Sequence, residues 1–161
     1  MALAYIALGS NLPSSARSPQ ATLNAAIEQL AALGQLVARS RFYTTEPVGY
    51  ADQPAFLNAA IALDTDLEPK ALLDRLLEIE LHFCRDRSHG IRNGPRTLDL
   101  DLILYDDRIL NSECLTLPHP RMHERSFVLL PLAEIAPSQI HPILHKTMKE
   151  LLQTLSREND K

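Results

Sequence analysis

Glycine is scarce in this chain, and the spacing of its glycines excludes two loops that commonly hold nucleotides. The five glycines are Gly9, Gly34, Gly49, Gly90 and Gly94. They cannot form G-x-x-x-x-G-K-[ST], whose backbone wraps around phosphates, or G-x-G-x-x-G, the dinucleotide fingerprint. If the chain binds phosphates, side chains and a metal ion must therefore hold them.

Cysteines and a broad basic surface are lacking as well. Cys84 and Cys114 form no C-x-x-C pair, which predicts two reduced thiols in a cytoplasmic protein rather than a disulfide framework or a cysteine metal site. The net charge of −4 argues against nonspecific binding to nucleic acid or to anionic membranes, because both usually require an extended basic face.

Long apolar runs are also absent. The apolar stretch 1–8 has no positive flank and is interrupted by Gly9-Ser10-Asn11. It is therefore too short for a signal core or a membrane span and is predicted to be a buried first strand. With 161 residues, 45% of them hydrophobic, the chain is predicted to form one domain over residues 1–161, with a frayed tail at 156–161.

Apolar periodicity and end signals divide the rest of the chain into helices and strands. A first helix is expected to begin at Ser18-Pro19 and to be capped by Gly34, and a second to run from Glu68-Pro69 to about Phe83. Two more are expected at 127–135, interrupted by a proline, and from a capping box at 147–150 through residue 155. Strands are predicted at 35–43, 56–63, 98–105 and 115–117.

Two aspartates alternate with leucines at the start of the predicted strand 98–105. Because strand side chains alternate between faces, Asp99 and Asp101 project from one face while the flanking leucines point into a core. Such carboxylates repel each other unless a cation lies between them, and Mg²⁺ prefers this all-oxygen ligation. The alternative is a solvated strand face on which Arg96 is an ordinary ion-pair partner.

A basic loop leads into this acidic pair. Segment 84–96 contains four arginines and a histidine and is broken by glycine and proline, so it is expected to become ordered on a ligand. Guanidinium groups suit phosphate oxygens. The alternative is a solubilising charge run, but a cationic loop beside two aspartates in an acidic chain is unusual. Together they indicate a nucleoside polyphosphate bound with Mg²⁺.

Two further polar features carry side chains suited to chemistry. Glu80 lies on the mainly apolar side of the second predicted helix, either as a site residue or as a boundary residue paired with Arg85. In segment 118–127, His119 could contact a nucleotide and Arg125 a phosphate. The residues alone favour surface charges with the nearby apolar side chains in the core, and the distance to the aspartates decides between the two.

Five motifs occur in the order known from one enzyme family: 4–12 (AYIALGSNL), 42–47 (FYTTEP), 52–60 (DQPAFLNAA), 94–101 (GPRTLDLD) and 118–122 (PHPRM). Over nearly its whole length the chain resembles the 6-hydroxymethyl-7,8-dihydropterin pyrophosphokinase family of folate biosynthesis. This resemblance implies a single α+β domain with a ferredoxin-like, mainly antiparallel sheet flanked by helices. It also implies Mg²⁺-dependent transfer of pyrophosphate from ATP to the pterin hydroxymethyl group, leaving AMP.

The resemblance implies roles for individual residues. Asp99 and Asp101 would bind the two Mg²⁺ ions expected with ATP, and would be catalytic together with Arg85 and Arg96. The ATP-binding residues would be Glu80, Arg85, Arg87, Arg96, His119 and Arg125. By the same resemblance, the pterin-binding residues would be Thr45, Pro47, Val48, Phe56, Asn58, Asp99 and Phe127. The chemistry agrees with this, since two aromatic rings suit a flat bicyclic heterocycle and an amide suits its pyrimidinone edge.

The chain departs from the family at Asn93, where tryptophan is common, so closure of the basic loop is expected to differ.

Two alternative functions remain. A nonenzymatic nucleotide-binding regulatory module on the same fold would keep the arginines but need not keep both aspartates. A Mg²⁺-dependent nucleotidyl transferase would keep the aspartates but would not require the pterin pocket. Nothing in the sequence demands a dimer, so a monomer is expected, with ATP and the pterin as its ligands.

Overall fold

The computed structural model describes residues 2–10, 18–45, 56–83 and 98–159. Its main sheet is antiparallel, with the strand order β2-β4-β1-β5 and β3 paired to β4. The strands are β1 Ala2–Ser10, β2 Gln35–Arg39, β3 Tyr43–Thr45, β4 Phe56–Thr65 and β5 Asp99–Tyr105, and a separate pair is formed by β6 Leu110–Asn111 and β7 Thr116–Leu117.

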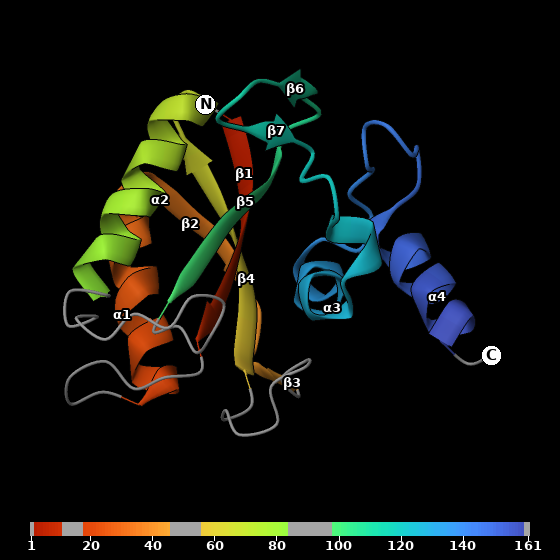
Figure 1. The fold of residues 1–161 in the computed structure, drawn as a ribbon, viewed down its shortest axis with the longest axis horizontal. Helices are drawn as coiled ribbons and strands as arrows, with labels where there is room; N and C mark the ends of the chain where they lie inside the picture. The colour runs from red at the N-terminus through yellow and green to blue at the C-terminus, as the bar shows by residue number, and fades with distance from the viewer. Residues whose placement is uncertain (1, 11–17, 46–55, 84–97, 160–161) are drawn as a thin grey trace.

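Helices cover both faces of this sheet (Figure 1). Helices α1 Pro19–Ala31 and α2 Pro69–Phe83 pack on one face, and α3 Ser126–Ile135 and α4 Met148–Asn159 lie on the other, after a short 3-10 helix, η1 Met122–Glu124. The order β1-α1-β2-β4-α2-β5 with strand order β2-β4-β1-β5 is the ferredoxin-like arrangement of split β-α-β units. The predicted α+β class is therefore confirmed.

Alternation along the strands divides the core into two layers. On β1, Ala4, Ile6 and Leu8 face α1 and α2, whereas Tyr5 belongs to the cluster that packs against α3 and α4. Because every second side chain points to the same face, each central strand contributes to both layers. The sheet is consequently buried on both faces over much of its length. None of the helices in the described ranges is long and apolar enough to span a membrane.

The ends of the first and last helices follow local rules. Ser18 Oγ accepts a hydrogen bond from the Ala21 N–H (3.2 Å), with Pro19 at the first helical position, as predicted. The capping box at the start of α4 is also confirmed, because Thr147 and Glu150 exchange backbone-to-side-chain hydrogen bonds of 3.0 and 3.1 Å.

Gly34 has a different role from the predicted one. The C-terminal cap of α1 is Ala32, so the prediction that Gly34 caps this helix is wrong. A Cβ at Gly34 would lie only 2.2 Å from the carbonyl oxygen of Asp64 on β4. Glycine is therefore required here because another backbone passes close by.

Three other boundaries differ from the predictions. The strand expected at 35–43 is divided into β2 and β3. Helix α3 continues through Pro131 because neighbouring residues such as Leu129 and Leu132 are buried, and this packing outweighs the hydrogen bond that proline cannot donate. Helix α4 extends to Asn159, so residues 156–159 are helical rather than a frayed tail.

Candidate active site

One row of the sheet brings together Asn58 and Asp99. Gly9 of β1 is paired with Asn58 on β4 and with Asp99 on β5. In the next row, Ala7 is paired with Ala60 and Asp101. Residues directly opposite each other in an antiparallel sheet point to the same face. The amide and the two carboxylates therefore share the face on which α3 packs.

The two aspartates alternate with core residues as predicted. Asp99 and Asp101 are half-buried, whereas Leu98, Leu100 and Leu102 are buried against α1 and α2. This alternation is confirmed, and it places both carboxylates on one side of β5. Within the described ranges, no group of three or more histidine, cysteine or acidic side chains could hold a metal ion. Mg²⁺ requires fewer protein ligands, because it retains waters and shares substrate phosphates with one or two carboxylates.

Small residues separate Asn58 from the aspartates. A Cβ at Gly9 would lie 3.1 Å from the Asn58 Oδ1, which is closer than ordinary van der Waals contact. With neighbouring strands about 4.8 Å apart, Asn58 and Asp99 are separated by roughly 10 Å across a position with no side chain. No local pattern in the sequence predicts this role for Gly9, because only the strand register places it between two predicted site residues.

Glu80 reaches the edge of β5 between the two aspartates. Its Oε2 accepts a hydrogen bond from the Leu100 N–H at 2.7 Å. Glu80 comes from the last part of α2, and β5 is at the end of the strand order. The helix glutamate therefore satisfies an edge-strand donor beside the acidic pair. This contact places Glu80 next to the predicted site and provides a structural role for it as well.

His119 is held next to Asp101. Its backbone N–H donates to the Ile103 carbonyl at 2.9 Å. Burial lowers the pKa of its imidazole, and the charges of Arg125 and Arg121 lower it too, while Asp101 partly opposes them. His119 Nδ1 accepts a hydrogen bond from the Arg121 N–H at 3.2 Å. The neutral ring therefore carries its proton on Nε2, which can donate to a ligand.

Arg125 and Phe127 mark the N-terminal end of α3. Arg125 is the N-cap residue of this helix, and its Cζ lies 5.8 Å from the centroid of the Phe127 ring. Phe127 remains 38% exposed, so its ring is not tucked into the core. An exposed aromatic ring under a guanidinium group is available to stack on a ligand.

The remaining described residues of the predicted pterin set lie on the paired strands β3 and β4. Thr45 is opposite Phe56, and Tyr43 is opposite Asn58. Asn58 is buried, with 6% of its surface exposed. Phe56 lies two residues before Asn58 and therefore faces the same side of the sheet. The structure thus brings Phe56, Asn58 and the aspartates onto one face.

Five predicted site residues lie outside the described residues: Pro47, Val48, Arg85, Arg87 and Arg96. The roles expected for them stay predictions.

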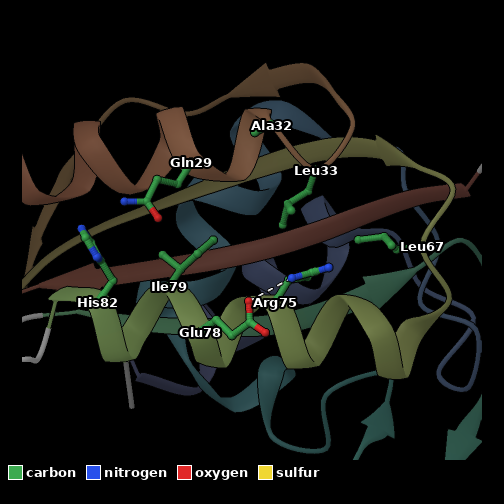
Figure 2. Close-up of a pocket in the computed structure, with 8 residues that line it drawn as sticks. All are labelled: Gln29, Ala32, Leu33, Leu67, Arg75, Glu78, Ile79 and His82. Atoms are coloured by element: carbon green, nitrogen blue, oxygen red, sulfur yellow. Dashed lines mark hydrogen bonds and ion pairs between the residues drawn. The ribbon is translucent and has the colours of Figure 1, made fainter.

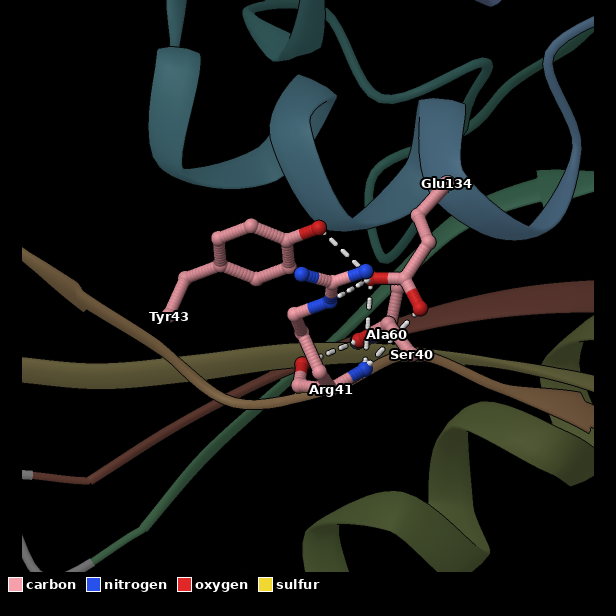
Figure 3. A network of polar contacts seen from close by, with 5 residues as sticks. All are labelled: Ser40, Arg41, Tyr43, Ala60 and Glu134. Atoms are coloured by element: carbon pink, nitrogen blue, oxygen red, sulfur yellow. Dashed lines mark hydrogen bonds and ion pairs between the residues drawn. The ribbon is translucent and has the colours of Figure 1, made fainter.

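A contact network that sequence reasoning missed surrounds Glu134 (Figure 3). Glu134, near the end of α3, accepts hydrogen bonds from the Tyr43 hydroxyl and from the backbone N–H of Arg41. These partners are more than ninety positions away in the chain, so no local pattern could have indicated them.

A separate pocket of about 600 Å³ opens between α1 and α2 (Figure 2). Its lining residues are Gln29, Ala32, Leu33, Leu67, Arg75, Glu78, Ile79 and His82. It lies in the helix layer on the opposite face of the sheet from the aspartate side chains, and none of the predicted site residues that the structure describes lines it. The pocket is therefore distinct from the candidate active site.

The fold and the site define an α+β domain with paired carboxylates beside a buried amide and an exposed aromatic ring. A family model described as 7,8-dihydro-6-hydroxymethylpterin-pyrophosphokinase (HPPK) matches residues 5–137. The chain belongs to this family.

Similar proteins agree with the family match. The chain is 48% identical over 133 residues to the 2-amino-4-hydroxy-6-hydroxymethyldihydropteridine pyrophosphokinase of Pseudomonas aeruginosa, covering 83% of this chain and 80% of that protein. It is 45% identical over 144 residues to the Haemophilus influenzae protein of the same name, covering 88% and 86%. A crystal structure of Plasmodium falciparum HPPK-DHPS matches with a TM-score of 0.73 at 16% identity. That match covers 100% of this chain but only 45% of the Plasmodium chain, and it supports the fold alone.

Proposed function

We infer that this protein transfers the pyrophosphoryl group of ATP to the hydroxymethyl group of 6-hydroxymethyl-7,8-dihydropterin in folate biosynthesis. Its products are AMP and the pterin diphosphate. Family membership supports this reaction. The observation that carries it in the structure is the row Asn58–Gly9–Asp99, with Asp101 on the same face of the next row.

The pterin would occupy the space over Gly9. A flat heterocycle can lie between an amide and a carboxylate that are roughly 10 Å apart, and the missing side chain at Gly9 lets it approach the sheet. Asn58 can both donate to and accept from the pyrimidinone edge. Phe56 and Phe127 would contact the ring faces, and Thr45, Pro47 and Val48 would complete the pocket.

The aspartates would bind Mg²⁺ together with the ATP phosphates. Two half-buried carboxylates on one strand face suit Mg²⁺, and two ions are expected with ATP. When bound, Mg²⁺ would neutralise polyphosphate charge as the β-phosphorus is attacked. His119 Nε2–H and Arg125 would donate to the nucleotide, with Glu80 beside them. Arg85, Arg87 and Arg96 would contact the polyphosphate from the segment before β5.

The reaction is a single displacement at the β-phosphorus. The hydroxymethyl oxygen of the pterin forms a bond to the β-phosphorus, and its proton is released to the solvent. The bond from the β-phosphorus to the oxygen shared with the α-phosphate breaks, and AMP leaves with that oxygen. Because both substrates would bind on one face of the sheet, the hydroxymethyl oxygen and the β-phosphorus would be held close together.

We also propose that the protein acts as a monomer in the cytoplasm, without nucleic-acid or membrane partners. The exposed free thiol of Cys114 supports a cytoplasmic location. The net charge of −4 argues against nucleic-acid and membrane partners.

Product analysis tests the function. Purified protein with ATP, Mg²⁺ and the pterin should release AMP and pterin diphosphate in equal amounts. Asp99→Asn and Asp101→Asn keep side-chain shape but remove a charged ligand, and each should lower turnover by at least about 100-fold. Asp107→Asn is the matched control, because Asp107 is exposed just beyond the other end of β5, and it should retain normal turnover.

Two other outcomes would contradict the proposal. ATP binding without AMP formation would indicate the regulatory module, and release of pyrophosphate would indicate nucleotidyl transfer. Full activity of both aspartate variants would contradict the metal assignment while leaving the reaction intact.

A further inference from the structure

Glu134 connects α3 to the segment that leads into β3. The Arg41 backbone N–H donates to both carboxylate oxygens, at 3.3 and 3.2 Å, and the Tyr43 hydroxyl donates to Oε1 at 2.5 Å (Figure 3). The Arg41 guanidinium Nε lies 3.4 Å from Oε1, but its side chain is 75% exposed. Exposed ion pairs contribute little to stability. The Glu134 carboxylate is therefore held mainly by its hydrogen bonds from the Arg41 backbone N–H and the Tyr43 hydroxyl.

The same segment is attached to β4 on its other side. The Ser40 N–H donates to the Ala60 carbonyl, and the Ala60 N–H donates back to Ser40 Oγ, both at 2.9 Å. Ser40 Oγ in turn donates to the Arg41 carbonyl at 2.8 Å. The segment 40–43 is therefore held between β4 and α3, and Glu134 is the helix residue that completes this connection.

These two attachments join the two halves of the proposed pterin pocket. One half lies on β3 and β4, where Tyr43 is paired with Asn58 and Thr45 with Phe56. The other half is Phe127, at the start of α3. Glu134 is seven residues beyond Phe127, about two helical turns, so both lie on the same side of the helix. A contact made at Glu134 therefore sets the position of Phe127 relative to the strands.

The hydrogen bond from Tyr43 strengthens this connection. The Glu134 side chain is partly covered, with 28% of its surface exposed, although its hydrogen bonds lie at the protein surface. Burial raises the pKa of Tyr43, and its hydrogen bond to Glu134 raises it further. The phenol therefore remains a proton donor throughout the neutral range, and the contact is a charge-assisted hydrogen bond.

We propose that Glu134 is a positioning residue for the pterin. By binding Arg41 and Tyr43, it holds α3 and its Phe127 at a set distance from Asn58 and Phe56, and so determines the width of the pterin pocket. This role rests on the proposed function. In this role Glu134 would act through Arg41 and Tyr43 rather than by touching the nucleotide or the reacting atoms.

Steady-state kinetics with each substrate varied separately provide the test. Glu134→Ala should raise the KM for the pterin at least about tenfold, because small misplacements of binding groups are costly. The KM for ATP and kcat should change by less than about threefold. Glu134→Gln retains an oxygen that can accept from the Arg41 N–H and the Tyr43 hydroxyl, so its KM for the pterin should stay within about threefold of wild type. Tyr43→Phe should give an intermediate increase.

Two charge-changing controls separate positioning from general effects. Arg41→Ala removes only the exposed guanidinium, and Glu78→Ala removes another carboxylate with a surface ion pair, to Arg75 on α2. Both should leave the KM for the pterin within about twofold of wild type. Calorimetric titration with the pterin and a nonhydrolysable ATP analogue should reproduce the KM differences as differences in Kd.

Each contrary outcome overturns a specific claim. A lowered melting temperature of Glu134→Ala with an unchanged KM for the pterin would reduce Glu134 to a stability role. Equal increases in both KM values would mean general loosening and would also refute the proposal. If the wild type forms no AMP, the proposed function fails, and the positioning role fails with it. Normal wild-type turnover with unaffected variants refutes only the role of Glu134.

Discussion

Replacing Gly9 by alanine should weaken pterin binding without unfolding the protein. The new methyl group would enter the row between Asn58 and Asp99, where its carbon lies 3.1 Å from the Asn58 Oδ1 and 3.9 Å from the Leu57 carbonyl oxygen. The second contact is ordinary. The contact with Asn58 Oδ1 requires the amide to move away by a few tenths of an ångström. The methyl group also raises the surface on which the ligand would lie.

The effect on stability should be small. Replacing glycine by alanine restricts the unfolded chain and stabilises a protein by about 0.4 to 1 kcal/mol where the backbone conformation permits it. Displacing one side-chain amide costs a similar amount, of the order of one weakened hydrogen bond, about 0.5 to 1.5 kcal/mol. The net change in the free energy of unfolding of Gly9→Ala should therefore stay within about 1 kcal/mol, or about 2 to 4 °C in melting temperature.

The effect on the pterin should be larger. A misaligned hydrogen bond from Asn58 costs about 1 kcal/mol, and loss of close approach over the Gly9 position adds a comparable amount. A total of about 1.5 to 3 kcal/mol corresponds to roughly 10- to 100-fold in Kd. Titration with the pterin measures this directly, and thermal melting measures stability on the same sample. An unchanged Kd in a folded Gly9→Ala variant would refute the proposed position of the pterin.

Gly34→Ala is the matched control with the opposite expectation. Its new Cβ would lie 2.2 Å from the Asp64 carbonyl oxygen. The backbone of a paired strand such as β4 cannot move far enough to relieve this clash. Overpacking of this kind lowers the free energy of unfolding by about 1 to 3 kcal/mol, or the melting temperature by roughly 2 to 12 °C at this chain length. Gly34 is remote from the aspartate row, so the folded fraction should bind the pterin normally.

Three further substitutions test contacts that stabilise the site and the fold. Glu80→Ala should lower the free energy of unfolding by about 1.5 to 3 kcal/mol in urea titrations, because the Leu100 N–H loses a charged acceptor, whereas Glu80→Gln should retain most of it. Thr147→Ala should lower the free energy of unfolding by about 1 kcal/mol, because it removes the hydroxyl that accepts a hydrogen bond from the Glu150 N–H. An unchanged urea midpoint would contradict this. The pKa of buried His141 is lowered by burial and then by the charges of nearby histidines. The free energy of unfolding should therefore fall as the pH drops below about 6.5, because there His141 gains a proton only in the unfolded chain. His141→Asn should flatten that slope, and an unaltered slope would refute the assignment.

Local patterns in the sequence were sufficient for most elements. The Asp-Leu alternation at 99–102 correctly placed two carboxylates on one face and the leucines in the core, because strand geometry has a period of two. Ser18-Pro19 and the Thr147–Glu150 capping box correctly marked helix starts, since these signals act over three or four residues. The α+β class, taken from the family resemblance, was also correct.

Contacts between distant segments required the tertiary structure. The register that puts Gly9 between Asn58 and Asp99 depends on the pairing of three strands, and the requirement for Gly34 depends on the passage of β4. Glu80 at the edge of β5 and Glu134 on Tyr43 join residues 20 and 91 positions apart. The sequence by itself determined which residue types face each side of an element. Only packing decided which of those faces meet, because that choice is made by the burial of the whole core rather than by any local signal.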